Sequence, residues 1–73
     1  MSQQKNIELL QKVTKRLKEL RENKGLSQQE VYNDTDIHIA RIEANNLNVT
    51  ITTLSRLCEY YEISLVEFFE KVK

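Results

Sequence analysis

Residues 25–43 read GLSQQEVYNDTDIHIARIE, and this stretch decides how the chain folds. It opens on the only glycine in the sequence, Gly25, and glycine readily adopts the left-handed conformation that ends a helix. Ser27 and Glu30 follow at the spacing of a capping box, in which each side chain binds the backbone N–H of the other residue. We therefore predict that one helix ends just before Gly25 and that another begins at Gln28.

The second half of this stretch predicts a tight turn between two short helices. Asparagine, aspartate and threonine form helices poorly, and they fill the last three positions of the second helix, residues 28–35. Residues 36–38 then form the turn. The apolar pair Ile39 and Ile42 predicts a third short helix over residues 38–44.

Three more helices are predicted outside this stretch. Apolar residues recur at steps of three and four over residues 4–23, as expected of a helix with one buried face. Thr50 is a suitable N-cap for a fourth helix over residues 51–61, and a second capping box at Ser64 begins a fifth over residues 65–72. The predicted fold class is therefore all-α, with five helices.

The composition agrees with one small helical domain over residues 1–73. The 73 residues are 40% hydrophobic and include no proline, which suits a compact core of helices joined by short turns. No apolar run is long enough to span a bilayer, so no membrane partner is expected. The first residues lack the apolar segment of a signal peptide, and we expect a cytoplasmic protein.

The set of reactive side chains argues against an enzyme and against a metal site. Cys58 is the only cysteine and His38 the only histidine, so the chain has few of the side chains that form a catalytic triad or a zinc site. One glycine cannot form a glycine-rich phosphate loop. We predict no catalysis, no cofactor and no metal. Cys58 falls on the apolar face of the fourth helix, where we expect a core residue.

Charge is spread unevenly along the chain. The net charge is zero, but residues 1–24 carry seven basic and three acidic residues, whereas residues 25–73 carry four basic and eight acidic ones. A nucleic-acid binder usually presents a basic face. Most of such a face would have to come from the first helix.

The order of these motifs resembles the XRE (Cro/lambda-repressor-like) helix-turn-helix family. The resemblance covers about residues 12–70 and depends on the joint order and spacing of short motifs, each of which is weak alone. The matching positions are Arg16-Leu17, Leu20-Arg21, Gly25-Leu26-Ser27-Gln28, Val31, Ile39, Arg41-Ile42-Glu43, Thr50, Thr53-Leu54, Leu57-Cys58, Tyr61, Ile63-Ser64-Leu65 and Phe68-Phe69.

The resemblance implies that the second and third helices form a helix-turn-helix and that the chain binds duplex DNA. In this family the third helix enters the major groove, while the start of the second contacts the phosphate backbone. Gln28 matches a glutamine that contacts a phosphate, at a helix start whose free N–H groups suit an anion. Arg21 and Glu43 match a partly buried salt bridge between the first and third helices, which we predict here as a structural pair.

The helix-turn-helix segment is three residues shorter than the family's usual spacing, a loss close to one helical turn. If the loss falls at the start of the third helix, His38, Ile39 and Arg41 remain near the groove. If it falls in the second helix or the turn, Thr35 caps the third helix and residues 36–38 face the DNA. The sequence leaves both arrangements open.

Two further departures from the family pattern concern the second helix and a loop. Tyr32 stands where the family has a small alanine, and we expect it to fill volume vacated by the missing turn. Asn45 replaces the usual glycine, and the loop over residues 46–49 lacks the basic residues often found there. This loss removes charge from a surface expected to touch phosphate.

The candidate DNA contacts come from the first three helices and the loop that follows them. At Arg41 the alternative is an ion pair with an acid such as Asp34, and at His38 it is a helix N-cap. Basic residues of the first helix are usually a solvated face, and Arg16 is the best candidate among them. The complete set of candidate DNA-binding residues is Gln28, His38, Ile39, Arg41, Arg16, Asn45, Asn46, Asn48 and Thr50.

Apolar side chains in the last two helices are more numerous than one small core needs, so we expect at least one exposed aromatic. They are Tyr60, Tyr61, Phe68, Phe69 and Val72. We predict a homodimer that associates through the last helices and binds half-sites about one turn of DNA apart. The predicted function is sequence-specific transcription regulation, as a dimeric repressor or an antitoxin-like autoregulator with a toxin or other protein partner. The alternative is a protein-interaction module that keeps this fold but has lost DNA reading.

Overall fold

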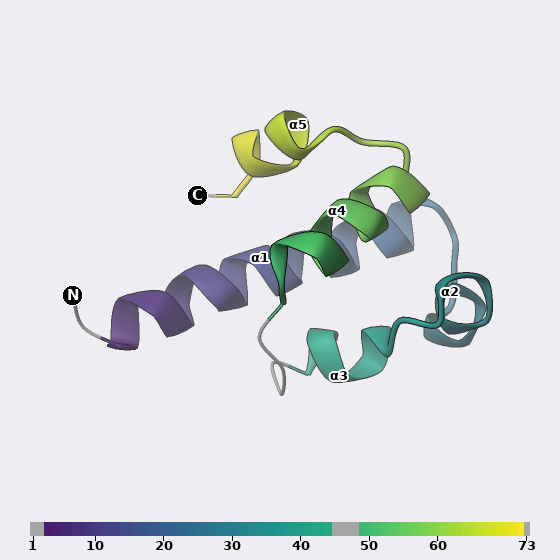
Figure 1. Ribbon diagram of the computed structural model, residues 1–73, viewed down its shortest axis with the longest axis horizontal. Helices are drawn as coiled ribbons and strands as arrows, with labels where there is room; N and C mark the ends of the chain where they lie inside the picture. Colours follow the sequence, from purple (N-terminus) through teal and green to yellow (C-terminus); the bar gives the residue numbers. More distant parts are fainter. Residues whose placement is uncertain (1–2, 45–48, 73) are drawn as a thin grey trace.

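The computed structural model describes residues 3–44 and 49–72, and these residues form five α-helices joined by short turns and loops (Figure 1). They are α1 (Gln3–Asn23), α2 (Gln28–Thr35), α3 (Ile39–Glu43), α4 (Ile51–Tyr60) and α5 (Leu65–Glu70). The all-α class and the order of the helices are confirmed, and helix ends differ from the prediction by at most two residues. None of these helices has the length and apolar character needed to cross a membrane.

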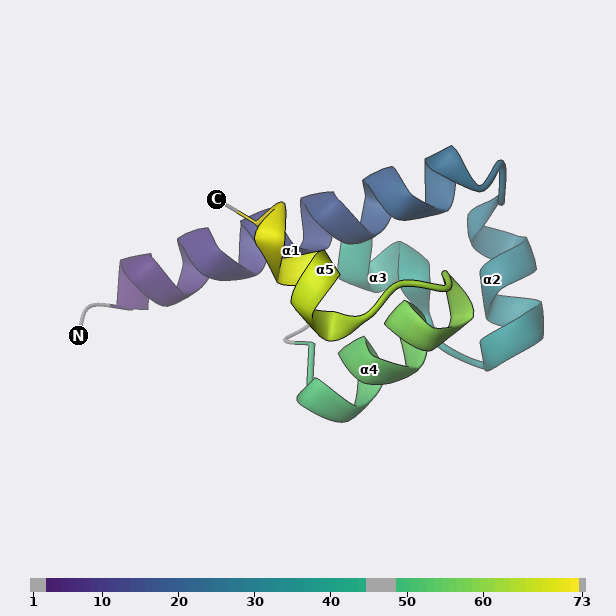
Figure 2. The same ribbon diagram turned by 90° about the horizontal axis from the view of Figure 1, so that it is seen from above.

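The long helix α1 organises the arrangement of the others. Helix α3 lies along one side of α1, and α2 lies beyond the C-terminal end of α1 (Figures 1 and 2). Helix α5 lies on the opposite side from α3, and it contacts α4. The α2–α3 pair therefore lies away from α5.

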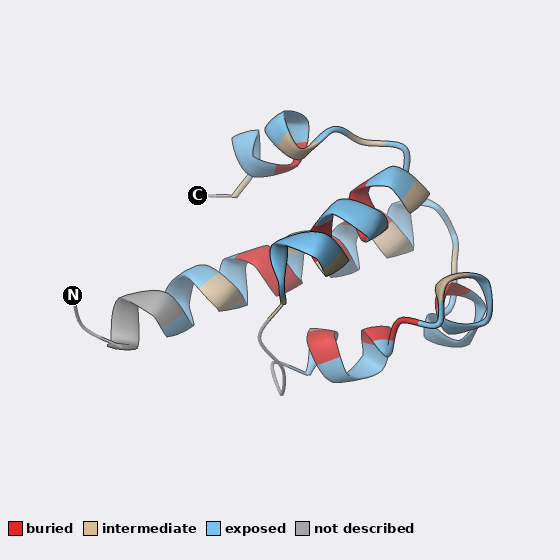
Figure 3. Ribbon diagram, viewed as in Figure 1, coloured by how far each residue is buried: buried red, intermediate tan, exposed pale blue. Residues whose placement is uncertain are grey.

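One hydrophobic core holds the helices together, and its side chains come from every helix (Figure 3). Burial of such side chains contributes about 1.5–3 kcal/mol each. The core residues are Val13, Leu17, Leu20, Val31, Ile37, Ile39, Ile42, Leu54, Leu57, Cys58, Tyr61 and Phe68. Cys58 is thus the core residue that the sequence predicts, and burial raises the pKa of its thiol.

Three helices stop at a residue in the left-handed conformation. Gly25 (φ 69°) follows α1, Asp36 (φ 62°) follows α2 and Glu62 (φ 62°) follows α4. After α1, the Leu26 N–H donates to the Arg21 carbonyl at 3.1 Å, and this carbonyl at the helix end also accepts the Lys24 N–H at 3.2 Å. Asp36 and Glu62 carry the strain of a side chain in this conformation, since only glycine adopts it freely.

The predicted helix starts are confirmed. Ser27 and Glu30 form a complete capping box at the start of α2, and Ser64 and Glu67 form another at the start of α5. The Thr50 hydroxyl accepts the Thr53 N–H at 3.1 Å and caps α4. Such caps contribute about 1 kcal/mol each.

Candidate nucleic-acid interface

The turn between α2 and α3 is defined by the backbone of Asp36. Its left-handed conformation redirects the chain at the end of α2, while its N–H still donates to the Tyr32 carbonyl. Ile37 then buries its side chain in the core, and His38 is the N-cap of α3. The turn thus joins two short helices through three residues, as the sequence predicts.

The structure excludes one of the two predicted arrangements of the shortened helix-turn-helix segment. Helix α2 keeps eight residues, whereas α3 has only five. The Thr35 hydroxyl donates to the Val31 carbonyl and accepts the Ile37 N–H, so it belongs to the end of α2. The arrangement in which Thr35 caps α3 and Ile37 faces DNA is therefore wrong.

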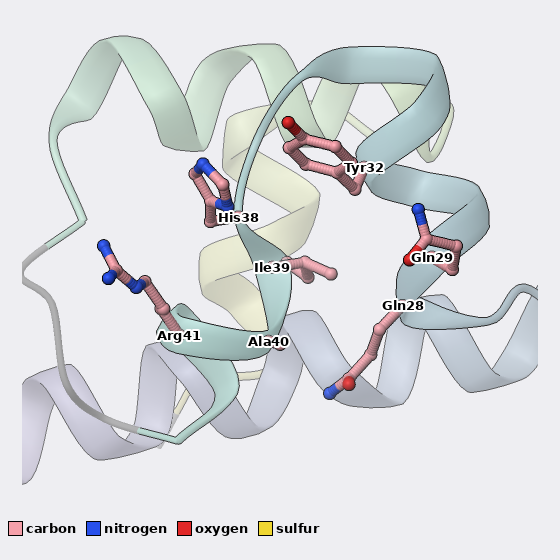
Figure 4. Close-up of a pocket in the computed structure, with 7 residues that line it drawn as sticks. All are labelled: Gln28, Gln29, Tyr32, His38, Ile39, Ala40 and Arg41. Carbon is pink, nitrogen blue, oxygen red and sulfur yellow. The ribbon is translucent and has the colours of Figure 1, made fainter.

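The short α3 leaves a hollow of ≈ 500 Å³ between itself and α2 (Figure 4). Its wall combines amide, aromatic, imidazole and guanidinium side chains, the groups that proteins use to contact DNA. The lining residues are Gln28, Gln29, Tyr32, His38, Ile39, Ala40 and Arg41. Three candidates from α3 and its N-cap therefore meet Gln28 at one hollow.

A salt bridge between Arg21 and Glu43 fixes α3 against α1. Arg21 Nε donates to Glu43 Oε2 at 2.7 Å, and Arg21 Nη2 donates to Oε1 at 3.0 Å. The Glu43 side chain is 4% exposed, so this two-bond pair lies almost out of solvent. Hydrogen bonding to Glu43 raises the pKa of Arg21, and Arg21 Nη1 also donates to the Leu26 carbonyl at 2.7 Å. The pair predicted from the sequence is present.

Gln28 adds a third donor to this arrangement. Its Nε2 donates to Glu43 Oε1 at 2.8 Å, from the first residue of α2 to the last residue of α3. The bond uses one of the two amide hydrogens, and the residue remains exposed. Gln28 therefore holds α2 against α3, while its phosphate contact stays a prediction.

Arg41 is the only arginine or lysine between residues 28 and 44, and no ion pair engages it in the part of the chain that the structure describes. The nearby acids have other partners. Asp34 accepts a hydrogen bond from the Tyr60 hydroxyl at 2.6 Å, and Glu30 accepts the Ser27 N–H in the capping box. The alternative of an Arg41–Asp34 ion pair is not observed, and the guanidinium remains exposed.

Tyr32 and His38 stack at the rim of the hollow. Their ring centroids lie 4.8 Å apart at an interplanar angle of 34°, so that a side chain of α2 supports the N-cap of α3 (Figure 4). The His38 side chain makes no capping hydrogen bond of its own. Tyr32 therefore packs against the N-cap of α3, while its filling of volume vacated by a missing turn stays a prediction.

Tyr61 lies beneath the Arg21–Glu43 pair, with its ring in the core. Burial raises the pKa of its phenol well above the ordinary value, and the nearby Glu43 carboxylate acts in the same direction. Its hydroxyl is buried and has no hydrogen-bond partner among the described residues. The phenol consequently stays neutral next to the salt bridge.

Comparison with known proteins agrees with this geometry. A family model described as a helix-turn-helix domain matches residues 14–73. The chain belongs to the XRE-type helix-turn-helix family. This is a family of DNA-binding transcription regulators. The match begins within α1, so the first turns of that helix precede it.

Two curated relatives share one name. The chain is 40% identical over 60 residues to "HTH-type transcriptional regulator PuuR" of Escherichia coli (strain K12), and equally to the protein of that name from Shigella flexneri. The alignment covers 78% of this chain and 32% of each relative, so the chain spans about a third of their length. No solved structure gives a significant match.

Two of the predicted DNA contacts do not present their side chains at the exposed helix-turn-helix surface. Ile39 is 1% exposed and points its side chain into the core, so it cannot reach a base. Arg16 lines a separate hollow beside Lys71 at the end of α5, and its side chain is 12% exposed. Because α5 and α3 lie on opposite sides of α1, Arg16 does not join the helix-turn-helix surface (Figure 1).

The remaining predicted contacts lie in and after the loop between α3 and α4. Thr50 uses its hydroxyl to cap α4, so the alternative of cap chemistry is the observed one. Asn45, Asn46 and Asn48 lie outside the described residues.

Arg56 of α4 contacts the helix-turn-helix, and the sequence did not predict this contact. Its Nη2 donates to the Thr35 carbonyl at 2.7 Å, and this carbonyl lies at the negative end of the α2 dipole. Arg56 also lines a hollow of ≈ 250 Å³ together with His38 and Asp36. No local motif indicates this contact, because it depends on how α4 packs against α2.

Proposed function

We propose that this chain binds duplex DNA sequence-specifically and regulates transcription as a homodimer, either as a repressor or as an antitoxin-like autoregulator. The observation that carries the proposal is the exposed Arg41 guanidinium, which has no ion pair with the described residues and lies on the outer face of the third helix of a helix-turn-helix. The family is one of binding proteins, and the proposal contains no catalytic step. Action on DNA also implies a cytoplasmic location.

The proposed mechanism divides positioning from reading. Backbone N–H groups at the start of α2, next to Gln28 and Gln29, suit a DNA phosphate because they lie at the positive end of the helix dipole. Phosphate contacts of this kind fix the register of the protein on the duplex. Arg41 suits a guanine, whose O6 and N7 accept two bonds from a guanidinium, and the Ala40 methyl suits a thymine methyl.

The proposed dimer contact is an apolar hollow of ≈ 310 Å³ where α1, α4 and α5 meet. Its exposed members include Leu9, Ile51 and Phe69, at 53%, 70% and 41% exposure. Helix α1 is predominantly basic, whereas the two charged residues of α5 are both acidic. A second copy that brings α5 against α1 would therefore pair opposite charges around an apolar centre.

The dimer proposal is tested by Phe69→Asp, which places a charge in that hollow. Sedimentation of this variant is expected to give a monomer at concentrations where the original chain is a dimer. Val66→Asp is the matched control, since Val66 is 72% exposed on the same helix and does not line the hollow. A monomeric original chain, or a dimer that survives Phe69→Asp, would contradict the proposed contact.

The DNA-binding proposal is tested by selection from a randomised duplex pool at about 100 mM salt, where nonspecific phosphate binding is weakened. Recovery of an inverted repeat is the expected result. Arg41→Ala should then weaken binding of the recovered duplex at least fivefold, because a bidentate guanine contact discriminates by about 1–3 kcal/mol. Lys18→Ala, which removes the same charge from an exposed position on α1, is the control and should bind nearly as the original chain.

The second candidate is a protein-interaction module on the same fold, and the charge of the surface favours it. Residues 28–44 contain four acidic residues and one basic residue, an unusual balance for a surface that meets phosphate. A toxin or another protein would then be the partner. Failure to retain any duplex at low salt would support this candidate and contradict DNA binding.

A further inference from the structure

The short α3 presents few side chains with which to read bases. Its first residue, Ile39, is buried, as is Ile42. The exposed side chains of this helix and its C-cap are Ala40, Arg41 and Ala44. Two of these three are methyl groups. A recognition surface with one polar side chain reads little sequence, so further contacts have to come from a neighbouring element.

The hollow beside α3 brings such an element into position. Tyr32 of α2 lines this hollow, and it is 37% exposed. Its ring centroid lies 4.8 Å from that of His38 (Figure 4), so His38 supports the ring while the side chain stays partly exposed. Tyr32 therefore lies on the same exposed surface as Arg41, and on a different helix.

Tyr32 and His38 differ from the two glutamines of the hollow in their hydrogen bonds. The Gln28 amide donates to Glu43 and the Gln29 amide donates to Asn33, so both amides already have partners within the protein. Within residues 3–44 and 49–72, no hydrogen bond engages the Tyr32 hydroxyl or the His38 ring nitrogens. These groups remain available to a ligand that enters the hollow.

We infer that Tyr32 is a specificity-determining residue that reads a thymine in the major groove from α2 and so compensates for the missing turn of α3. The exposed part of its ring contacts the thymine C5-methyl group, which is the one apolar feature of the major groove. His38 holds the ring in place, while Arg41 reads the neighbouring base pair. The inference rests on the proposed DNA binding and adds a residue of α2 to the reading surface.

The test compares the selected duplex with a duplex in which single thymines are replaced by uracil, which lacks only the methyl group. For the original chain, one such replacement is expected to weaken binding about fourfold, as loss of one buried methyl group predicts. In Tyr32→Ala, which installs the small residue usual in the family, the same replacement should have no effect. Tyr32→Phe keeps the ring and should keep the fourfold effect, and it also serves if Tyr32→Ala folds poorly.

The outcomes separate the inference from the proposal on which it rests. If the original chain selects a sequence motif but Tyr32→Ala keeps the same sensitivity to every uracil, the inference is overturned and DNA reading stands. A chain that selects no motif overturns both. The assignment is supported if one uracil position in each half-site weakens binding by the original chain and by Tyr32→Phe but not by Tyr32→Ala.

Discussion

Removing Arg21 should cost this domain a large share of its stability, because the residue neutralises a carboxylate that water barely reaches. Arg21→Met keeps the length of the side chain but removes the two bonds to Glu43 and the bond to the Leu26 carbonyl. Among the described residues, the Glu43 carboxylate, 4% exposed, is then left with the Gln28 amide as its one remaining side-chain donor. A buried charge without its counter-charge is among the most destabilising changes in a protein.

The size of the loss can be compared with the stability available. Breaking one side of a buried ion pair costs about 3–5 kcal/mol. A chain of this length has a total free energy of unfolding of about 4–11 kcal/mol at ~0.05–0.15 kcal/mol per residue. Arg21→Met should therefore remove roughly half of this stability. The double variant Arg21→Met with Glu43→Leu removes both charges and should recover most of the loss, because an apolar pair of similar volume replaces the salt bridge.

Urea unfolding followed by far-ultraviolet circular dichroism measures both effects. The two single variants and the double variant form a thermodynamic cycle with the original chain. A loss below about 1 kcal/mol for Arg21→Met would refute the reasoning, since it would mean that water reaches Glu43 in the folded state. A double variant as unstable as the sum of the single variants would refute it equally, because the two charges would then act independently.

Further predictions concern two neighbouring tyrosines and two left-handed residues. Tyr60→Phe should lower the free energy of unfolding by about 0.5 kcal/mol, because it removes an exposed hydrogen bond to Asp34. That hydrogen bond raises the pKa of Tyr60 to about 12, above its ordinary value of 10, so its contribution is complete below pH 10 and is lost as pH rises from 10 to about 12. Stability measured across this interval should fall less in Tyr60→Phe, and an unchanged slope would contradict the assignment. Tyr61→Phe should instead raise stability by about 1 kcal/mol in the same urea assay, because it removes a buried hydroxyl that lacks a partner among the described residues; a loss would mean that the hydroxyl is satisfied. Asp36→Gly should stabilise the chain by about 0.5–1 kcal/mol, because it relieves a side chain in the left-handed conformation. Gly25→Ala should destabilise the chain by about 1 kcal/mol, because it places a side chain in that conformation. A Cβ at Gly25 meets no other atom, so the cost comes from the backbone conformation alone. Thermal unfolding compares the two, and shifts of the same sign would show that backbone conformation is not the cause.

The helices and their caps could be predicted because their signals are local. Ser27 and Ser64 each precede a glutamate at the third following position, and the structure has both capping boxes. The burial of Ile39 also had a local signal, since its spacing of three residues from Ile42 puts both on one face of the helix. The family resemblance places Ile39 at the DNA surface, whereas its spacing from Ile42 indicates burial, and the structure agrees with the spacing.

The composition of the site was harder to predict, because it depends on how the helices pack. Arg16 lies beside the apolar stripe of α1, and only the docking of α5 decides which neighbours it meets. The bond from Gln28 to Glu43 joins residues 15 positions apart and requires the observed α2–α3 geometry. The same holds for the contact between Arg56 and the Thr35 carbonyl. Sequence reasoning identified the helix-turn-helix but could not assign these partners.

The buried thiol of Cys58 has a consequence for how copies of this protein can associate. It is the only cysteine, and at 2% exposure it cannot meet the thiol of another folded copy. Oxidation therefore cannot lock two folded chains together by a disulfide. Any pairing of folded copies is reversible and falls apart on dilution. If the paired form is the one that binds an inverted repeat, occupancy rises more steeply than in proportion to the amount of protein, so a modest change in its synthesis or degradation acts as a switch.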